Sequence, residues 1–350
     1  MTVSSGPVQI TGYAAHAKGA DLVPFTYDAP ALGADDVHIE ISHCGVCHSD
    51  IHTLDEGWGP TAYPCIVGHE IVGTVQAIGE HVTHLAVGDR VGVGAQCGAC
   101  SRCSTCLHGK DNLCGHGVFT YNATHPSGRV AYGGYAQAVR VPGDYAFKLP
   151  ADLPSDVAAP LLCAGVTVFA PLKRHMFPGA RVGVVGIGGL GHLAVQFAKA
   201  LGASEVVGLS TSDRKAKDAA ALGATKFVVL NSPEAFAANS NTLDIILCTA
   251  SHHDMPWDAY VNLLDAEGKF IVVGLPEDSI KINLASVIFR QRSIVGSLIG
   301  AKNEIVDMLD FAAKHKVRPW IETMPMTEVN TAIARLRKGD VTYRFVLKNE

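Results

Sequence analysis

The sequence predicts an α/β protein of two parts, a β-rich barrel or sandwich followed by a doubly wound parallel sheet. The chain has 350 residues, which is too long for one compact core and suggests about two domains. Short alternating apolar runs between turn residues fill the first part. From about residue 150, apolar strands and helical patterns take turns instead, which indicates βαβ units.

In the first part, residues 37–41 and 73–78 alternate apolar and polar side chains, as half-buried strands do. Proline and glycine interrupt the pattern at Pro64, Gly79 and Pro142. Short strands joined by long connections are typical of an all-β barrel or sandwich.

In the second part, helical spacing over residues 155–176 leads into a strict alternation of strands and helices. This alternation implies right-handed crossovers and a parallel sheet. The predicted strands are 181–186, 205–209, 226–230, 243–248, 269–274 and, as a sixth, 293–298; the first helices are 190–201 and 213–222.

The C-terminal part carries helical patterns over residues 302–316 and 326–338 and a short strand at 343–347. This segment could pack back onto the first domain. We therefore expect a first domain formed by residues 1–156 and 298–350, interrupted by a second domain at residues 157–297.

Composition excludes several classes of protein. The chain is 48% hydrophobic and 17% charged, so it can bury a core, and its net charge of −5 gives no strong signal for nucleic acid or an anionic membrane. Residues 1–20 lack the regions of a secretory signal, and no run of 18 apolar residues predicts a transmembrane helix. We therefore expect a cytoplasmic protein, in which ten cysteines indicate metal binding or catalysis rather than disulfides.

A glycine-rich turn follows the first strand of the second domain. Gly186-Ile187-Gly188-Gly189-Leu190-Gly191 fits G-x-G-x-x-G and stands between a valine-rich strand and a helix, as the motif requires. The first glycine permits the tight turn, the second lets the backbone approach a pyrophosphate, and the third lets the helix lie close to the strand. A turn without a ligand is the alternative, but the context favours a dinucleotide at the helix N-terminus.

The end of the second strand favours NADP(H) over NAD(H). Sites for NAD place an acid there, about 20 residues after the glycines, whereas this chain has Ser210. Hydroxyls can donate to a 2′-phosphate and a cation can neutralise it. Asp213 would be the acid if the strand ran further, and the cations could belong to an ordinary exposed helix start. The candidate contacts are Ser210, Thr211, Ser212, Arg214 and Lys215.

Five cysteines lie within 18 residues, in a loop rich in glycine and serine. Thiolates at this spacing can bind one tetrahedral zinc ion, and a closed site of four thiolates is structural. Five cysteines are one too many, and spacing alone does not show which is spare. An iron–sulfur cluster and disulfides are the alternatives. The five are Cys97, Cys100, Cys103, Cys106 and Cys114.

A second set of metal-ligand types is spread over the first 163 residues. It comprises Cys44 and Cys47, then Gly68-His69-Glu70, and finally Cys163. Taken singly, each is unremarkable, because a lone buried cysteine is usually a small hydrophobe. The first two could form a redox C-x-x-C pair, but no thioredoxin-like βαβ context surrounds them.

Together these motifs resemble the zinc-dependent medium-chain alcohol dehydrogenases, from about residue 10 to the end of the chain. Within that family the sequence is most similar to the cinnamyl alcohol dehydrogenase branch. The resemblance implies a GroES-like barrel domain, a Rossmann domain, and a homodimer or homotetramer. The residues that carry it are Gly68-His69-Glu70-x-x-Gly73 with Gly79 and Val82, Cys47-His48-Ser49-Asp50, the C-x2-C-x2-C-x7-C loop, Ser210-Thr211-Ser212, and residues 341–345.

The resemblance implies two zinc ions in each chain. A catalytic zinc would be held by Cys47, His69 and Cys163, which leaves one position open for substrate. A structural zinc would be held by the four loop cysteines other than Cys97, so that Cys97 and Cys44 become extra thiols. The implied structural ligands are Cys100, Cys103, Cys106 and Cys114.

The resemblance also implies roles around the catalytic zinc. Ser49 would take the proton of the alcohol and pass it by way of the cofactor ribose to His52. Asp50 would orient His69, Glu70 would lie behind the metal, and Arg344 would reach the cofactor phosphates. A structural ion pair is the alternative for Asp50 and Arg344.

Trp58 and Phe119 match positions that line the substrate channel in the family, and Ile299 is a third candidate; an apolar channel suits aryl and allylic aldehydes. Phe119 stands where a tryptophan is common in the plant members of the branch. We therefore expect an NADP-dependent reductase of aromatic and medium-chain aliphatic aldehydes. The alternatives are a polyol or terpenoid alcohol dehydrogenase with the same site, and a non-catalytic NADP-binding sensor.

Overall fold

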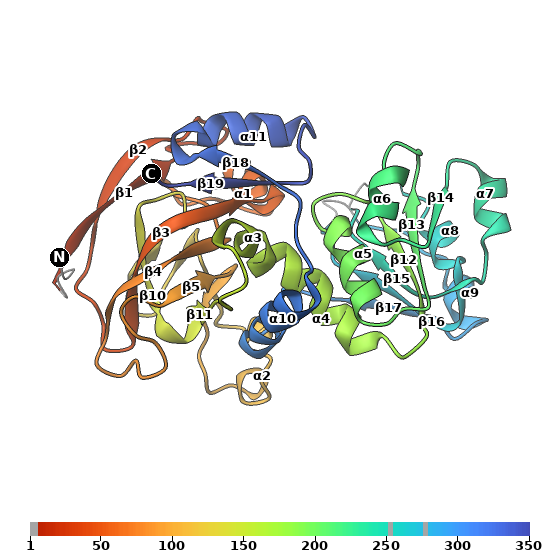
Figure 1. Cartoon of the computed structure of the whole chain (residues 1–350), viewed down its shortest axis with the longest axis horizontal. Coiled ribbons are helices and arrows are strands. Elements are labelled where there is room, and N and C mark those ends of the chain that lie inside the picture. The colour runs from red at the N-terminus through yellow and green to blue at the C-terminus, as the bar shows by residue number, and fades with distance from the viewer. Residues whose placement is uncertain (1–5, 251–254, 276–278) are drawn as a thin grey trace. The chain divides into compact units, whose positions relative to one another are not determined.

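The computed structural model describes residues 6–250, 255–275 and 279–350. It divides into two compact units (Figure 1): unit 1 comprises Met1–Cys163, Gly300–Lys314 and Arg318–Glu350, and unit 2 comprises Ala164–Ile299 and His315–Val317. The first division falls after Cys163 rather than after residue 156. The reason is that α3 (Ser155–Pro160) packs on β3 and β4 of unit 1 instead of opening unit 2.

Unit 1 is built on a seven-stranded sheet, and this confirms the β-rich first domain. Its strands run in the order β11 (Phe147–Lys148), β5 (Arg90–Val93), β4 (Ile71–Ile78), β3 (Asp36–Val46), β19 (Arg344–Lys348) and β18 (Ile321–Pro325), and β10 (Ala138–Pro142) also pairs with β3. Three two-stranded sheets flank it: β1 (Val8–Ala14) with β2 (Val23–Ala29), β6 (Gln96–Gly98) with β7 (Val118–Phe119), and β8 (Ala123–Thr124) with β9 (Val130–Ala131).

The C-terminal strand returns to the first domain, as the sequence suggested. Strand β19 pairs antiparallel with β3, with Phe345 opposite Val46, and parallel with β18. Phe345 is fully buried, so the end of the chain completes the core of unit 1. The helices of this unit are α1 (His48–Leu54), α2 (Ser104–Leu107), α3, α10 (Lys302–His315) and α11 (Val329–Arg337).

Unit 2 is a six-stranded parallel sheet, which confirms the doubly wound fold (Figure 1). The strand order is that of a dinucleotide-binding sheet. It runs β14 (Lys226–Val229), β13 (Glu205–Ser210), β12 (Arg181–Val185), β15 (Leu243–Cys248), β16 (Leu264–Val272) and β17 (Ser293–Gly296). The helices are α4 (Val166–His175), α5 (Gly191–Ala200), α6 (Ala216–Leu222), α7 (Pro233–Ala238), α8 (Trp257–Val261) and α9 (Leu284–Ile288).

The helix expected over residues 155–176 is not uniform. A π-helical turn, Leu161–Gly165, separates α3 from α4 and contains Cys163. Such wide turns occur often at functional sites. The whole stretch Ser155–His175 is long and apolar enough to cross a membrane, but 83% of its most apolar window is buried inside the protein, and a buried core helix meets the same criterion.

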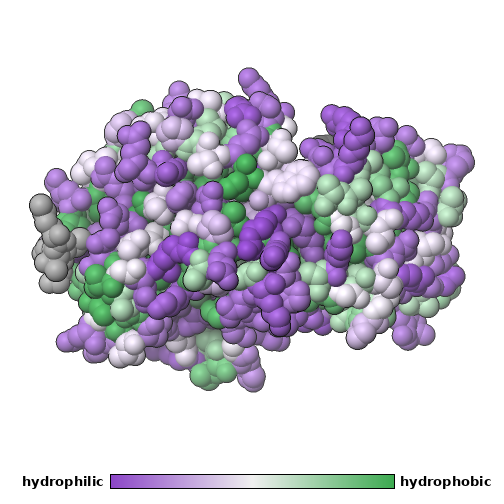
Figure 2. All heavy atoms as spheres, viewed as in Figure 1, coloured by the Kyte–Doolittle hydropathy of each residue, from purple (hydrophilic) through white to green (hydrophobic). Residues whose placement is uncertain are grey.

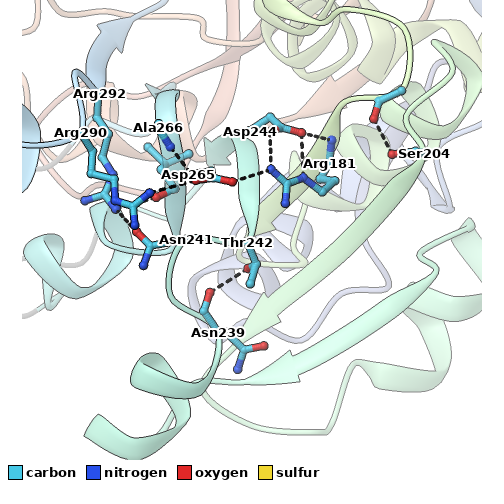
Figure 3. A network of polar contacts seen from close by, with 12 residues as sticks. Arg181, Ser204, Asn239, Asn241, Thr242, Asp244, Asp265, Ala266, Arg290 and Arg292 are labelled. Carbon is cyan, nitrogen blue, oxygen red and sulfur yellow. Dashed lines mark hydrogen bonds and ion pairs between the residues drawn. The ribbon is translucent and has the colours of Figure 1, made fainter.

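Hydrogen bonds between charged side chains connect the amino ends of three neighbouring strands in unit 2 (Figure 3). The guanidinium of Arg181 donates to Asp244 at 2.6 Å and to Asp265 at 3.1 Å, and Arg290 donates to Asp265 at 3.2 Å. Arg181, Asp244 and Asp265 lie at the starts of β12, β15 and β16. This network therefore occupies the edge of the sheet opposite to the carboxyl ends, where ligands bind in such sheets.

Hydrophilic side chains predominate on the face seen in Figure 2, and apolar ones are scattered among them. Isolated exposed apolar residues are normal on a protein surface.

Candidate metal centres and cofactor-binding turn

A buried group of four metal-ligand side chains lies in unit 1. The donor atoms of Cys47, His69, Glu70 and Cys163 all lie within 4.8 Å of one another, and all four residues are buried. Cys47 is the residue before α1, His69 and Glu70 precede β4, and Cys163 lies in the π-helical turn. Three separate elements thus bring together the side chains that the sequence resemblance proposed as a catalytic site.

The carboxylate of Asp50 holds this group in place. One oxygen accepts hydrogen bonds from His69 Nδ1 at 2.9 Å and from the Gly68 backbone at 3.1 Å. The other oxygen accepts from the Cys47 backbone at 2.9 Å and from the Tyr135 hydroxyl at 2.8 Å. Because Nδ1 donates to Asp50, Nε2 of His69 has its lone pair available, and it lies 3.1 Å from Cys163 Sγ.

The electrostatics of this group suit a cation. The hydrogen bond from Cys163 and the charge of Arg344 lower the pKa of the Cys47 thiol well below its usual value, against the effect of burial. Burial opposes protonation of His69, but the neighbouring Asp50 carboxylate outweighs it and raises the pKa of the imidazole. A thiolate and an imidazole that is oriented by a carboxylate are ligands that zinc binds in proteins.

Glu70 forms a buried ion pair with Arg344, both residues being almost fully inaccessible. Burial raises the pKa of Glu70 to about 7, although the guanidinium acts in the opposite direction. The second carboxylate oxygen has no hydrogen-bond partner among the described residues, and it lies 1.8 Å from where a Cβ on Gly45 would be. Arg344 therefore forms the structural ion pair that was the alternative to a contact with the cofactor phosphates. The second oxygen of Glu70 remains without a hydrogen-bond partner among the described residues.

The second metal-ligand group is in the cysteine-rich segment between β6 and β7, which also contains α2 and the 3₁₀ turn η1 (Asp111–Leu113). The Sγ of Cys103 lies 3.5 Å from that of Cys106 and 3.8 Å from that of Cys114, which lies 3.5 Å from that of Cys100. Four bonds of about 2.3 Å to a tetrahedral zinc separate the sulfurs by about 3.8 Å. These four residues therefore fit a structural zinc ion.

Cys97 lies apart from the four. It is fully buried, with its thiol 3.4 Å from the Phe119 carbonyl and 3.7 Å from Nε2 of His125. Burial raises the pKa of this thiol to about 12. The structure thus brings Cys100, Cys103, Cys106 and Cys114 together and leaves Cys97 in the core, a choice that spacing alone left open.

The proton-relay candidates of unit 1 lie on α1, which begins directly after Cys47. The Ser49 hydroxyl is 3.6 Å from Cys47 Sγ, and His52 is one turn further along α1. The His52 ring stacks on Trp58, with centroids 4.5 Å apart. Trp58 and Phe119 are both about half exposed, as a channel wall would be, and Ile299 is part of unit 2.

In unit 2, the residues from Gly186 to Gly191 form a tight turn between β12 and α5, as the sequence predicts. Gly186 has a φ of +84°, which disfavours any other residue. A Cβ on Gly191 would lie 1.8 Å from the Gly186 carbonyl oxygen, so the helix packs on the turn as closely as backbone allows. A Cβ on Gly188 would meet nothing within 4 Å, which leaves this side of the turn open for a ligand. Gly189 and Leu190 complete the turn before α5.

The second strand of unit 2, β13, ends at Ser210, and Asp213 is an exposed residue beyond its end. The Ser210 hydroxyl accepts from the Ser212 backbone at 3.4 Å, and Arg214 Nε donates to the Ser212 hydroxyl at 3.3 Å. Thr211 is exposed between them, and Lys215 lies 3.6 Å from Asp218. The strand end therefore presents hydroxyls and a guanidinium, and the residue at its tip is a serine.

Comparison with known proteins identifies the family. Residues 33–151 match the alcohol dehydrogenase GroES-like domain, and residues 189–314 match the zinc-binding dehydrogenase domain. The chain therefore belongs to the zinc-dependent medium-chain alcohol dehydrogenases, as the motifs predicted.

Relatives place it in the cinnamyl alcohol dehydrogenase branch. The chain is 44% identical over 346 residues to vomilenine reductase from Rauvolfia serpentina, a match that covers 97% of this chain and 95% of that protein. A cinnamyl alcohol dehydrogenase structure from Sorghum bicolor matches with a TM-score of 0.93 and 39% identity, over 97% of this chain and 98% of that one. The structure of CAD from Helicobacter pylori complexed with NADP(H) matches with a TM-score of 0.90 and 34% identity, over 98% of each chain. The protein is thus an oxidoreductase of the alcohol dehydrogenase type.

Sequence reasoning did not identify Tyr135, whose hydroxyl donates to Asp50 from 85 residues away. The one signal was the pair of glycines before it. A Cβ on Gly133 would lie 2.5 Å from the Val67 backbone, and one on Gly134 would lie 2.4 Å from Ile71. Adjacent glycines in a β-rich domain mark such a close approach.

Proposed function

We propose that this protein is an NADP-dependent zinc alcohol dehydrogenase that transfers hydride between NADPH and aromatic, cinnamyl-type or medium-chain aliphatic aldehydes. The observation that carries this proposal is the buried group of Cys47, His69 and Cys163, oriented by Asp50. Two thiolates and one imidazole would hold the catalytic zinc and leave a fourth position for the substrate oxygen. Cys100, Cys103, Cys106 and Cys114 would hold a second, structural zinc.

Zinc at this position would polarise the substrate oxygen and lower the pKa of an alcohol, while the nicotinamide supplies the hydride. The residues around it provide the remaining functions. Ser49, close to Cys47 Sγ, takes the alcohol proton, and His52 delivers it to solvent. Asp50 holds the His69 ring in one tautomer and one orientation, and Glu70 keeps an unpartnered carboxylate oxygen beside the ligands.

The preference for NADP(H) is supported by Ser210 at the end of β13, followed by Thr211, Ser212, Arg214 and Lys215. A carboxylate at the strand end would repel the 2′-phosphate, whereas hydroxyls can donate to it. The Michaelis constant for NADPH should therefore be lower than that for NADH. Ser210→Asp should reverse this preference. Ser210→Asn should not, because the asparagine side chain has the shape of aspartate without its charge. A lower Michaelis constant for NADH in the wild type would refute the proposal.

The substrate class is supported by two half-exposed aromatic side chains of unit 1, Trp58, which stacks on the proton-relay candidate His52, and Phe119 of β7. The relatives named above act on different molecules, so a panel of aldehydes assayed with NADPH at 340 nm is the decisive experiment. Turnover of aryl or medium-chain aldehydes that stops when zinc is chelated is expected. Faster oxidation of polyols or terpenoid alcohols, assayed with NADP+ in the reverse direction, would favour those substrates, and no turnover in either direction at full zinc loading would favour a sensor.

We also propose that the protein is cytoplasmic and assembles as a homodimer or homotetramer. The support for assembly is β17, which ends the sheet of unit 2 and exposes Ile294. An unpaired strand edge can pair with a second copy across a two-fold axis. Light scattering should give two or four times the chain mass of 36.8 kDa. A particle with the mass of one chain would contradict this assembly.

A further inference from the structure

We infer that Thr249 and His192 are positioning residues for the phosphate-binding turn, each fixing one backbone carbonyl so that the turn presents its open side to the cofactor. Neither residue is part of the G-x-G-x-x-G motif, and both lie in unit 2. The inference rests on the proposed function, because the anion concerned is the cofactor pyrophosphate.

A glycine-rich turn that binds an anion has a chemical difficulty. Its peptide N–H groups attract phosphate, but each peptide also carries a carbonyl oxygen with a partial negative charge, which repels phosphate. Four of the six residues in this turn are glycines, so few side chains within the turn restrict which way a carbonyl faces. Groups outside the motif must therefore hold the carbonyls of Gly186 and Gly188.

Thr249 holds the first carbonyl. It follows the last residue of β15, and its hydroxyl lies 2.9 Å from the Gly186 oxygen and 2.9 Å from the Val185 oxygen. Its backbone N–H also donates to Val185 at 3.1 Å. The Gly186 oxygen occupies the space where a Cβ on Gly191 would be. This carbonyl is therefore directed between the start of α5 and the neighbouring strand.

His192 holds the second carbonyl. It is the second residue of α5 and is fully buried. Its backbone N–H donates to the Gly188 oxygen at 3.0 Å, and its Nδ1 lies 3.1 Å from the same oxygen. Because a carbonyl only accepts, Nδ1 carries the proton. Both lone pairs of the Gly188 carbonyl oxygen thus accept hydrogen bonds from His192 of α5. A Cβ on Gly188 would face open space.

The test compares affinities for two ligands by calorimetry: NADPH, and adenosine 2′-monophosphate, which has the adenosine and the 2′-phosphate but no pyrophosphate. Thr249→Val and His192→Leu remove the two hydrogen bonds. Thr249→Ser and His192→Asn are the matched controls, since a serine hydroxyl and an asparagine amide can still donate. We expect Thr249→Val and His192→Leu each to weaken NADPH binding about fivefold or more, the factor that one net hydrogen bond corresponds to. Binding of adenosine 2′-monophosphate should not change, and the controls should bind NADPH like the wild type.

NADPH binding of wild-type strength in Thr249→Val and His192→Leu would overturn the inference. So would an equal loss of affinity for both ligands, because the two residues would then support the unit as a whole rather than the turn. Failure of the proposed function is a separate result, visible in the wild type before any substitution is made: a protein that does not use NADP(H) would bind neither ligand, and a sensor would bind both without turnover of any substrate.

Discussion

At the scale of single residues, Asp50 is the centre of a buried network of hydrogen bonds. The carboxylate accepts four hydrogen bonds, two on each oxygen, so both oxygens are satisfied by protein donors. Its position fixes both the start of α1 and the ring of His69. A buried polar group of this kind is costly if one partner is lost.

Removal of the Tyr135 hydroxyl should therefore destabilise unit 1. Tyr135→Phe deletes a hydrogen bond to a buried charge, and such a bond contributes about 1.5–3 kcal/mol to the free energy of unfolding. Urea unfolding of the zinc-loaded protein measures the change. Tyr132→Phe, a half-buried tyrosine whose ring lies 4.4 Å from that of Tyr27, is the control and should cost less. Equal losses in the two variants would show that Asp50 does not depend on Tyr135.

His38 should make the stability of the protein depend on pH. It is buried, and its Nδ1 accepts a hydrogen bond from Arg140 Nε at 3.1 Å, so a proton on Nδ1 would face a guanidinium. Burial and the Arg140 charge lower the pKa of His38 to about 4. In the unfolded chain the group titrates near its usual value of about 6.5. Between these values the unfolded chain binds more protons, so the free energy of unfolding falls as the pH falls from about 6.5 to 4.

His38→Asn is the comparison for this prediction, since its amide oxygen can still accept from Arg140 but does not titrate. Urea unfolding at several pH values should give a shallower loss of stability in this variant than in the wild type. Parallel curves for the two proteins would mean that His38 gains its proton at the same pH in the folded and unfolded states.

At the scale of elements, the strands of unit 2 were the most predictable part of the chain. Strand β15 occupies the predicted residues 243–248, and β12 and β13 each differ from prediction by one residue at their ends. Their apolar runs are short and are bounded by glycine or polar residues, so the sequence indicates both that they are strands and where each strand begins and ends. The glycine motif was equally readable, because its conformational demands fall within six consecutive residues.

Features that depend on distant contacts were not predictable. The π-helical turn that carries Cys163 interrupts a helix whose apolar spacing continues across it, so periodicity did not reveal it. Strand β16 begins at Leu264, before the predicted residue 269, because it pairs with Leu243 of β15. The partners of Asp50, Gly186 and Gly188 lie outside the motifs that contain those residues. Their hydrogen bonds exist only once the chain is folded.

The cysteine-rich loop allows a direct comparison between two thiols that the sequence could not distinguish. Cys114→Ala should lose one of two zinc ions per chain, because it removes one of four converging sulfurs. Cys97→Ala should keep both ions, since its thiol faces the Phe119 carbonyl and His125 instead. Zinc counted per chain by mass spectrometry is the measurement. Loss in Cys97→Ala with retention in Cys114→Ala would reverse the assignment.

At the scale of the whole molecule, the two units have separate chemical roles. Among residues 6–250, 255–275 and 279–350, both groups able to hold a metal belong to unit 1, and the glycine turn with its carbonyl-holding residues belongs to unit 2. Unit 1 is also discontinuous in sequence, since β19 completes its sheet after the whole of unit 2. Metal binding should therefore stabilise one unit and leave the other unaffected.

Zinc removal tests this division. A ligand that binds only the folded state stabilises it, and for structural zinc sites the binding free energy contributes directly to folding. Chelation should speed amide hydrogen exchange in residues 100–114, at the start of α1 next to Cys47, and in the π-helical turn that contains Cys163. Exchange in β12, β13 and β15 should stay unchanged, because their cores contain no metal-ligand group among the described residues. Exchange mass spectrometry with and without chelator makes the comparison, and an equal increase in both units would contradict the separation of roles.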